Sequence, residues 1–241
     1  MTRLTCRGDV RRCRGDRSPR RDLLPSECPV AALLTQACLA VCAAEVSPPR
    51  AVPERRPSRL TPVSKREALL GHAVELFGEK GYEATCLDDI GASAGVTGPN
   101  LYSYFESKAD LLDAALERGT SALWLLLHSV LRENDDSRRA LVALVDGYVR
   151  LAMDQTILTS LLLTEQSSLT DVARARQREY VAEWTALLRA SRPRLDETSA
   201  RILVHTALGL IHIMPRIEHL QANASFSVDL TAMATAVLLT D

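Results

Sequence analysis

Aromatic residues are scarce in this chain of 241 residues, where Phe, Trp and Tyr together make up 4%. Acidic and basic residues nearly balance, and the formal net charge is -1. The total charge therefore indicates no strongly acidic or basic partner, so a nucleic-acid site would have to come from local placement of charge. Hydrophobic residues still make up 46% of the chain, which is enough for one or two globular cores.

Cysteine is almost absent from the part of the chain that has a folded pattern. Five of the six cysteines lie in the first 42 residues at irregular spacings, and only Cys86 follows. A disulfide framework would need cysteine pairs within the core, and a zinc site would need short paired spacings. We therefore expect neither, and we expect no cofactor.

Catalytic motifs are also lacking. The sequence has no Gly-rich phosphate loop, no nucleophile elbow and no H-E-x-x-H motif. His205 and His212 share a helix face at i, i+7, but two ligands do not complete a zinc site, so core or interface histidines are the better interpretation. We predict that the chain is not an enzyme and holds no metal.

Residues 1–62 differ in composition from the rest. They hold 12 arginines against six acidic residues, and eight of the 11 prolines. Prolines at this density break helices and strands, so we predict a disordered basic extension whose removal leaves stability nearly unchanged.

An apolar stretch within the extension, Val30 to Val46, leaves alternatives open. It is compatible with a marginal helix, but it is too short to span a bilayer. Ending near Ala44, it also resembles the apolar region of a signal peptide, which would make the protein an exported helical interaction protein or enzyme. A third alternative is that the native protein begins near Val63.

After Val63 the apolar residues recur at helical spacing, and no run alternates as a strand does. The sequence predicts an all-α fold of about nine helices: 65–80, 87–94, 98–104, 108–132, 137–153, 156–164, 169–190, 196–220 and 227–239. We place one domain at 63–123 and a second at 124–241.

A short turn separates the second and third of these helices. Thr85 is predicted to cap the second helix, Gly95 permits the tight turn, and Thr97 is predicted to cap the third. Helix, short turn and helix form a helix-turn-helix motif, at about 86–105, whose second helix enters the DNA major groove.

The third helix carries the candidate DNA contacts. Asn100 can read adenine, and Gly98 and Pro99 let the backbone approach the groove. Hydroxyls and cations around it are suited to phosphates. The predicted DNA-binding residues are Lys65, Arg66, Thr85, Thr97, Gly98, Pro99, Asn100, Tyr102, Ser103, Tyr104 and Lys108.

The stretch from Lys65 to Leu116 resembles the DNA-binding domain of the tetracycline-repressor (TetR/AcrR) family of bacterial transcription regulators. Its landmarks are Phe77, Gly81-Tyr82, Thr85, Ile90, Ala94-Gly95-Val96, Leu101-Tyr102, Tyr104-Phe105, Ser107-Lys108 and Leu111-Leu112. Cys86 stands where the family often has Ser or Thr, and Gly98-Pro99 where Lys-Gly is common. The resemblance implies an all-helical ligand-binding and dimerisation domain in the remainder, with a four-helix dimer bundle built from the last two long helices.

We therefore expect a cytoplasmic homodimeric repressor that binds double-stranded operator DNA, is released by a small apolar effector, and has no membrane partner. Residues 63–110 hold eight acidic residues against four basic ones, so affinity must come from a few placed cations and a second copy. Aromatic residues spread over three helices are predicted to line the effector pocket: Trp124, His128, Tyr148, Tyr180 and Trp184.

Overall fold

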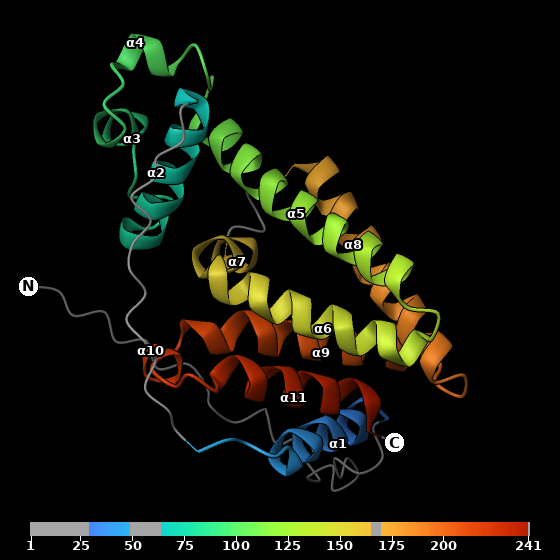
Figure 1. Ribbon diagram of the computed structural model, residues 1–241. Helices are drawn as coiled ribbons and strands as arrows, with labels where there is room; N and C mark the ends of the chain where they lie inside the picture. The colour runs from blue at the N-terminus through green and yellow to red at the C-terminus, as the bar shows by residue number, and fades with distance from the viewer. Residues whose placement is uncertain (1–28, 49–63, 165–169, 241) are drawn as a thin grey trace, which may run out of the picture.

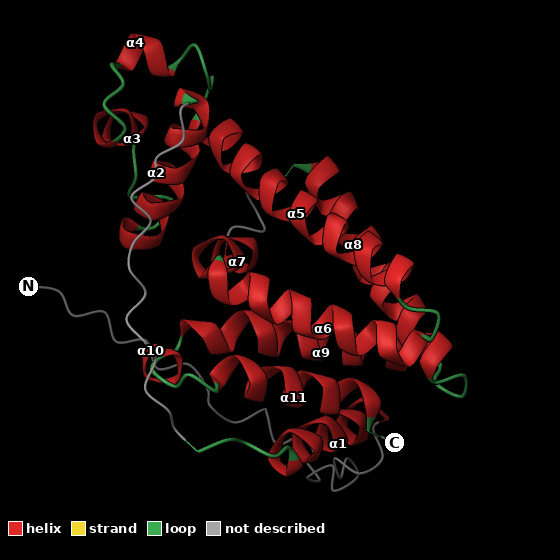
Figure 2. Cartoon of the chain, in the orientation of Figure 1, coloured by secondary structure: helices red, strands yellow, loops and turns green. Residues whose placement is uncertain are grey.

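The computed structural model describes residues 29–48, 64–164 and 170–240, and all regular elements in these ranges are helical (Figures 1 and 2). The helices are α1 (Pro29–Ala43), α2 (Lys65–Lys80), α3 (Leu87–Ser93), α4 (Gly98–Leu101), α5 (Lys108–Glu133), α6 (Ser137–Asp154), α7 (Thr156–Thr164), α8 (Asp171–Ser191), α9 (Glu197–Ile213), η3 (Met214–Arg216), α10 (Glu218–Gln221) and α11 (Phe226–Leu239). The all-α prediction is confirmed.

Two clusters of buried side chains divide the chain. One joins α2, α3, α4, the first half of α5 and two leucines of α7. The other joins the second half of α5 to α6, α8, α9 and α11. Figure 1 shows α2, α3 and α4 together at one end of α5, with α6 and α8 beside the rest of α5 and with α9, α11 and α1 beyond α6.

The first cluster forms because α2 presents an apolar stripe. Leu69, Leu70, Ala73 and Phe77 recur at helical spacing and are all buried. The helix ends at Gly81, whose φ of +85° is costly for other residues, and the Gly81 N–H donates to the Phe77 carbonyl over 3.0 Å. The ring of Tyr82 then packs edge-on against Phe77, with centroids 5.2 Å apart.

The predicted helix at 196–220 is wrong beyond Ile213. The α-helix stops there and continues as the 3-10 turn η3 and the short helix α10. Pro215 is the physical reason, because its nitrogen cannot donate to a carbonyl one turn earlier and its ring disfavours an uninterrupted helix.

The prediction that residues 1–62 are disordered is wrong for 29–48, while 1–28 and 49–63 lie outside the described residues. Helix α1 packs against α11 and α9 (Figure 1). The two buried residues of its inner face are small, with Ala37 3% and Ala40 7% exposed, and Leu33 and Val41 pack beside them against the core. Beyond the helix, the Ser47 N–H donates over 2.9 Å to Asp229 on α11, a carboxylate that is only 3% exposed.

A cleaved signal segment would not be expected to pack on its own protein in this way. The alanines of α1 allow this helix to approach α11 closely, as small residues do at helix contacts. Removal of residues 1–48 would expose this apolar surface. We therefore expect their removal to lower the free energy of unfolding, in place of the unchanged stability predicted from the sequence. No helix among the described residues is long and apolar enough to cross a bilayer.

Replacing Ala37 with Arg should lower the free energy of unfolding by about 1–3 kcal/mol, because a long cation would enter a close-packed contact. Leu39 is the matched control: it lies on the same helix and is 64% exposed. Its change to Arg should alter stability by less than about 0.5 kcal/mol. Urea unfolding followed by circular dichroism measures both, and equal effects would show that α1 is not docked.

Candidate nucleic-acid interface and ligand groove

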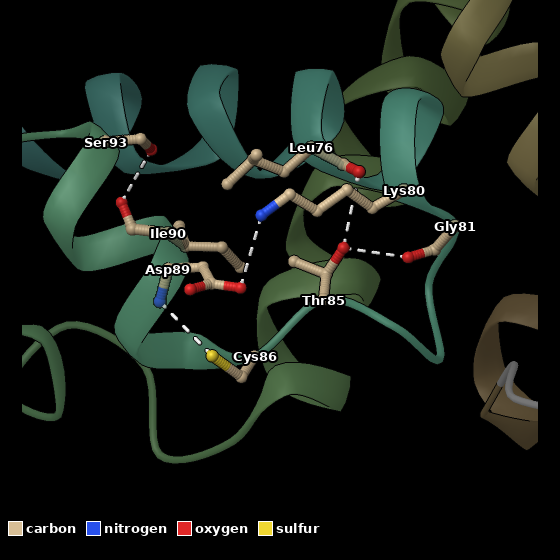
Figure 3. Close-up of polar contacts among 8 residues, drawn as sticks. All are labelled: Leu76, Lys80, Gly81, Thr85, Cys86, Asp89, Ile90 and Ser93. Atoms are coloured by element: carbon tan, nitrogen blue, oxygen red, sulfur yellow. Dashed lines mark hydrogen bonds and ion pairs between the residues drawn. The ribbon is translucent and has the colours of Figure 1, made fainter.

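Helix α3 begins differently from the prediction. Its N-cap is Cys86, whose sulfur accepts the Asp89 N–H over 3.4 Å. Thr85 does not cap it: the hydroxyl is 2% exposed and donates back to the carbonyls of Gly81 and Leu76 over 2.8 and 3.3 Å (Figure 3). Thr85 therefore closes the end of α2 from inside the fold, and it does not belong to the DNA-facing surface.

Asp89 at the start of α3 also pairs with the preceding helix. The Lys80 ammonium lies 3.4 Å from its carboxylate (Figure 3). The hydrogen bond from the Cys86 side chain and the nearby Lys80 charge lower the pKa of Asp89. Because both side chains are largely exposed, this pair contributes little to stability.

The turn between α3 and α4 depends on two glycines. Gly95 has φ of +66°, as predicted for the tight turn. Gly91 permits a close approach, because a Cβ there would lie 2.9 Å from the Val96 carbonyl oxygen. The Val96 N–H donates to the Gly91 carbonyl over 2.8 Å, which fixes the turn. The predicted helix-turn-helix motif is thus present.

Helix α4 is shorter than predicted and ends at Leu101 instead of Tyr104. The N–H groups of Tyr104 and Phe105 both donate to the Leu101 carbonyl, so the chain leaves the helix in a tight turn. The Ser103 hydroxyl donates to the Asn100 carbonyl over 2.6 Å. Leu101 and Phe105 are buried, as predicted.

Helix α4, which carries most of the residues predicted to face DNA, lies at one extremity of the fold (Figure 1). Thr97, Asn100 and Ser103 are exposed, and Tyr102 is 54% exposed. Tyr104 is also exposed, and Gly98 and Pro99 form the first turn of α4.

Two predicted cations, Lys65 and Arg66, begin α2 and are exposed. The Arg66 guanidinium lies 4.8 Å from the centroid of the Phe105 ring, which brings the start of α2 close to the end of the α4 turn. These residues therefore share one surface with α4.

Lys108 is held inward. It begins α5, where the Ser107 hydroxyl accepts the Asp110 N–H over 3.1 Å as the predicted cap. The Lys108 ammonium donates to the carbonyls of Tyr82 and Glu83 over 2.8 and 3.3 Å, and it lies 4.3 Å from the centroid of the Tyr82 ring. These contacts give Lys108 a structural role that the sequence did not indicate.

The five predicted ligand-binding residues do come together, and two of them line the large groove described below. Ring centroids lie 5.9 Å apart for Trp124 and His128, 5.5 Å for Trp124 and Tyr180, and 5.6 Å for Tyr148 and Trp184. Trp184 is fully buried in the core, and His128 is exposed on the outer side of α5.

The cavity is a groove of about 720 Å³ between α8 and α9, floored by Tyr148 of α6 and Leu123 of α5; we name it the α8–α9 groove. Its size is within the usual range for small-molecule sites. Tyr148 and Tyr180 line it, whereas Trp124, His128 and Trp184 do not. His205, His212 and several arginines complete its lining.

A polar pair of a buried tyrosine, Tyr148, and a partly buried histidine, His212, lies at the inner wall of the groove. The Tyr148 hydroxyl and the Nε2 atom of His212 share a hydrogen bond of 2.7 Å. Burial raises the pKa of Tyr148 and lowers the pKa of His212 to about 4, so both groups are neutral near pH 7. His212 lines the groove, whereas His128, the histidine predicted for the pocket, does not.

Sequence reasoning missed His212 and the arginines as groove residues. The signal was present in the common face of His205 and His212, both of which line the groove. Among the described residues, no group of three or more His, Cys, Asp or Glu side chains is arranged to hold a metal ion.

Replacing Lys108 with Met should lower the free energy of unfolding by about 1–3 kcal/mol, because the carbonyls of Tyr82 and Glu83 lose a charged donor and the Tyr82 ring loses its cation. Lys80→Met is the control, since it removes a lysine from an exposed pair and should cost at most about 1 kcal/mol. Thermal unfolding compares them. A harmless Lys108→Met change would show that the ammonium is not held by these carbonyls.

Stability should also fall as the pH drops from about 6.5 to 4. Unfolded His212 takes up a proton near its ordinary pKa of about 6.5, whereas the folded protein resists this until about pH 4. The His212→Gln variant should lose part of this pH dependence, and a His205→Gln control on the exposed part of α9 should keep it. If the two variants have the same pH profile, His212 is not buried as described.

Comparison with known proteins agrees with this geometry. Residues 69–115 match the bacterial regulatory proteins of the tetR family. The chain is 38% identical over 94 residues to the HTH-type transcriptional activator FasR of Mycolicibacterium smegmatis. The aligned stretch covers 39% of this chain and 43% of FasR. The chain thus spans about two fifths of the length of this curated relative.

Solved structures extend the likeness to most of the fold. A TetR-family transcriptional regulator from Bordetella parapertussis superposes with a TM-score of 0.66 at 21% identity, over 73% of this chain and 94% of that one. AibR, solved in complex with isovaleryl coenzyme A and operator DNA, superposes with a TM-score of 0.63 at 20% identity, over 73% of this chain and 98% of that one. By sequence, residues 69–115 match the tetR family of bacterial regulatory proteins, and the described helices share the fold of a solved TetR-family regulator.

Proposed function

We propose that the chain is a ligand-responsive DNA-binding transcription regulator, released from its operator by a small effector with an apolar body. The observation that carries this proposal is the exposed polar end of α4, presented by a buried helix-turn-helix core. The names of its relatives support it, since FasR is a transcriptional activator and AibR was solved with operator DNA.

In this proposal α4 enters the major groove. Asn100 reads a base edge, because its amide can both donate to and accept from adenine. Thr97, Tyr102, Ser103 and Tyr104 contribute hydroxyls to phosphates, and the backbone at Gly98 and Pro99 approaches the groove. Lys65 and Arg66 add the cations.

We infer that Lys108 acts on DNA binding indirectly. Its ammonium is engaged with the carbonyls that precede α3, so its main effect is on the placement of the helix-turn-helix motif. A contact of its remaining donor with phosphate is compatible with this geometry, because an ammonium has three donors.

Two copies are needed for useful affinity. Acidic residues outnumber basic ones in this module, so one copy gains little from the phosphates. We infer a homodimer through α9 and α11, as the family resemblance implies. In the single chain α1 lies on these two helices, so α1 and a second copy would compete for part of the surface.

The effector is proposed to bind in the α8–α9 groove and to favour a dimer whose recognition helices no longer match successive major grooves. Only a difference in affinity between the two conformations can shift that equilibrium. Helices α6, α8, α9 and α11, with the second half of α5, surround the groove, and we call them the groove domain. Helices α5 and α7 contact α2, and they also contact helices of the groove domain, which gives the two sites a physical connection.

The docking is tested on a duplex selected from random DNA. Asn100→Ala should cost about 1–3 kcal/mol and relax the preference at one base position, whereas Thr97→Val should weaken all duplexes alike. Both residues are exposed, so folding should be unaffected. Binding titrations against single-base variants of the duplex measure the pattern, and an Asn100→Ala protein with unchanged specificity would refute this assignment.

A further inference from the structure

The α8–α9 groove combines an apolar inner wall with a cationic mouth. Leu123, Val181 and Leu208 line it together with the rings of Tyr148 and Tyr180. Four arginines also line it, and they are Arg174, Arg178 and Arg189 of α8 and Arg201 of α9.

The positive charge at this mouth is only partly balanced. Among the described residues that line the groove, the only carboxylate is Glu197, which lies 3.6 Å from Arg189. Arg174 pairs with Asp171 over 2.9 Å, and the more distant Arg178 charge also helps to lower the pKa of Asp171. One acidic neighbour is thus shared by two arginines, and Arg201 makes no ion pair among the described residues.

A single exposed arginine is well solvated and indicates little. Here the arginines converge on one concave site with an apolar wall, where field lines are focused and water is partly excluded. A guanidinium is also suited to bind carboxylate or phosphate oxygens with two parallel hydrogen bonds. The site therefore favours an anion over a neutral molecule of the same shape.

The inner wall adds a second observation. Tyr180 is 5% exposed, and its hydroxyl has no acceptor among the described residues, because the neighbouring Trp184 indole N–H can only donate to it. Burial raises the pKa of Tyr180, so the hydroxyl keeps its proton and can donate. A buried donor without an acceptor is costly. The hydroxyl is itself covered by protein atoms, so what Tyr180 contributes to the groove lining is its ring.

We propose that the α8–α9 groove binds an amphipathic anion, with its apolar chain against the tyrosines and leucines and its carboxylate or phosphate at Arg178 and Arg201. The inference rests on the proposed function in taking this molecule as the effector. It narrows the expected effector from any small apolar compound to one with an anionic head.

Three probes with the same tail test this without DNA: dodecanoate, dodecyl phosphate and dodecanol, each below its micellar concentration. Calorimetric titration of the full chain should give at least about tenfold tighter binding for an anion than for the alcohol, a difference of about 1.4 kcal/mol. The tighter of the two anions identifies the head group. Equal affinity for all three, or no binding of any, overturns the inference.

The arginines are tested by a double variant, Arg178→Gln with Arg201→Gln. Both side chains are exposed, so the fold should be kept. Anion affinity should fall about tenfold or more, with dodecanol affinity nearly unchanged. Arg194→Gln is the matched control, because Arg194 is exposed in the loop between α8 and α9 and does not line the groove. An equal loss in the control, or none in the double variant, contradicts the assignment.

The outcomes separate this inference from the proposed function. Selective anion binding by a chain that binds no specific DNA would leave the groove assignment standing and remove the regulator. Specific DNA binding by a chain that prefers dodecanol would support the regulator and overturn the groove assignment.

Discussion

Helix α5 contributes buried side chains to both hydrophobic cores, and the positions of the two candidate sites depend on it. Leu111, Leu112 and Leu116 pack in the helix-turn-helix core, whereas Leu123 and Leu127 pack in the groove domain. The Ser107 cap and Lys108 fix the start of this helix beneath Tyr82. A continuous helix of 26 residues thus holds the α4 surface at one end and a wall of the groove near the other.

Helix α7 forms a second connection between the domains. Leu158 of α7 belongs to the helix-turn-helix core, although its helix follows α6 of the groove domain. Gly78 of α2 leaves room for Ile157, since a Cβ there would lie 2.8 Å from that side chain. Because α7 contacts α6 and α9 as well as α2, a shift of α6 or α9 would press on α2 through packed side chains, which resist gradual deformation. This contact offers a physical route by which the groove could bias the spacing of two α4 helices.

Much of this architecture could be predicted from the sequence, because apolar periodicity gave the bounds of α2 and α7 and came within two residues for most other helices. Where the predicted caps and helix ends were wrong, competing local interactions decided the structure. Cys86 caps α3 because Thr85 is more stable bonded to the end of α2, and Pro215 ends α9 in a stretch that stays apolar. Helix α1 was hidden by its proline-rich surroundings, since only tertiary contact reveals that the alanine stripe fits α11. The aromatic cluster was predicted, but the groove arginines were not, because their convergence needs the antiparallel pairing of α8 and α9.

The central claim is that two α4 helices, presented by one symmetric pair of chains, read a specific DNA sequence. Selection of bound fragments from a random duplex library by the full chain tests this most directly. The account predicts enrichment of an inverted repeat whose half-sites are centred about 34–36 Å apart, one helical turn of DNA. A folded chain that enriches no sequence, or whose enriched fragments share no two-fold symmetry, would contradict it.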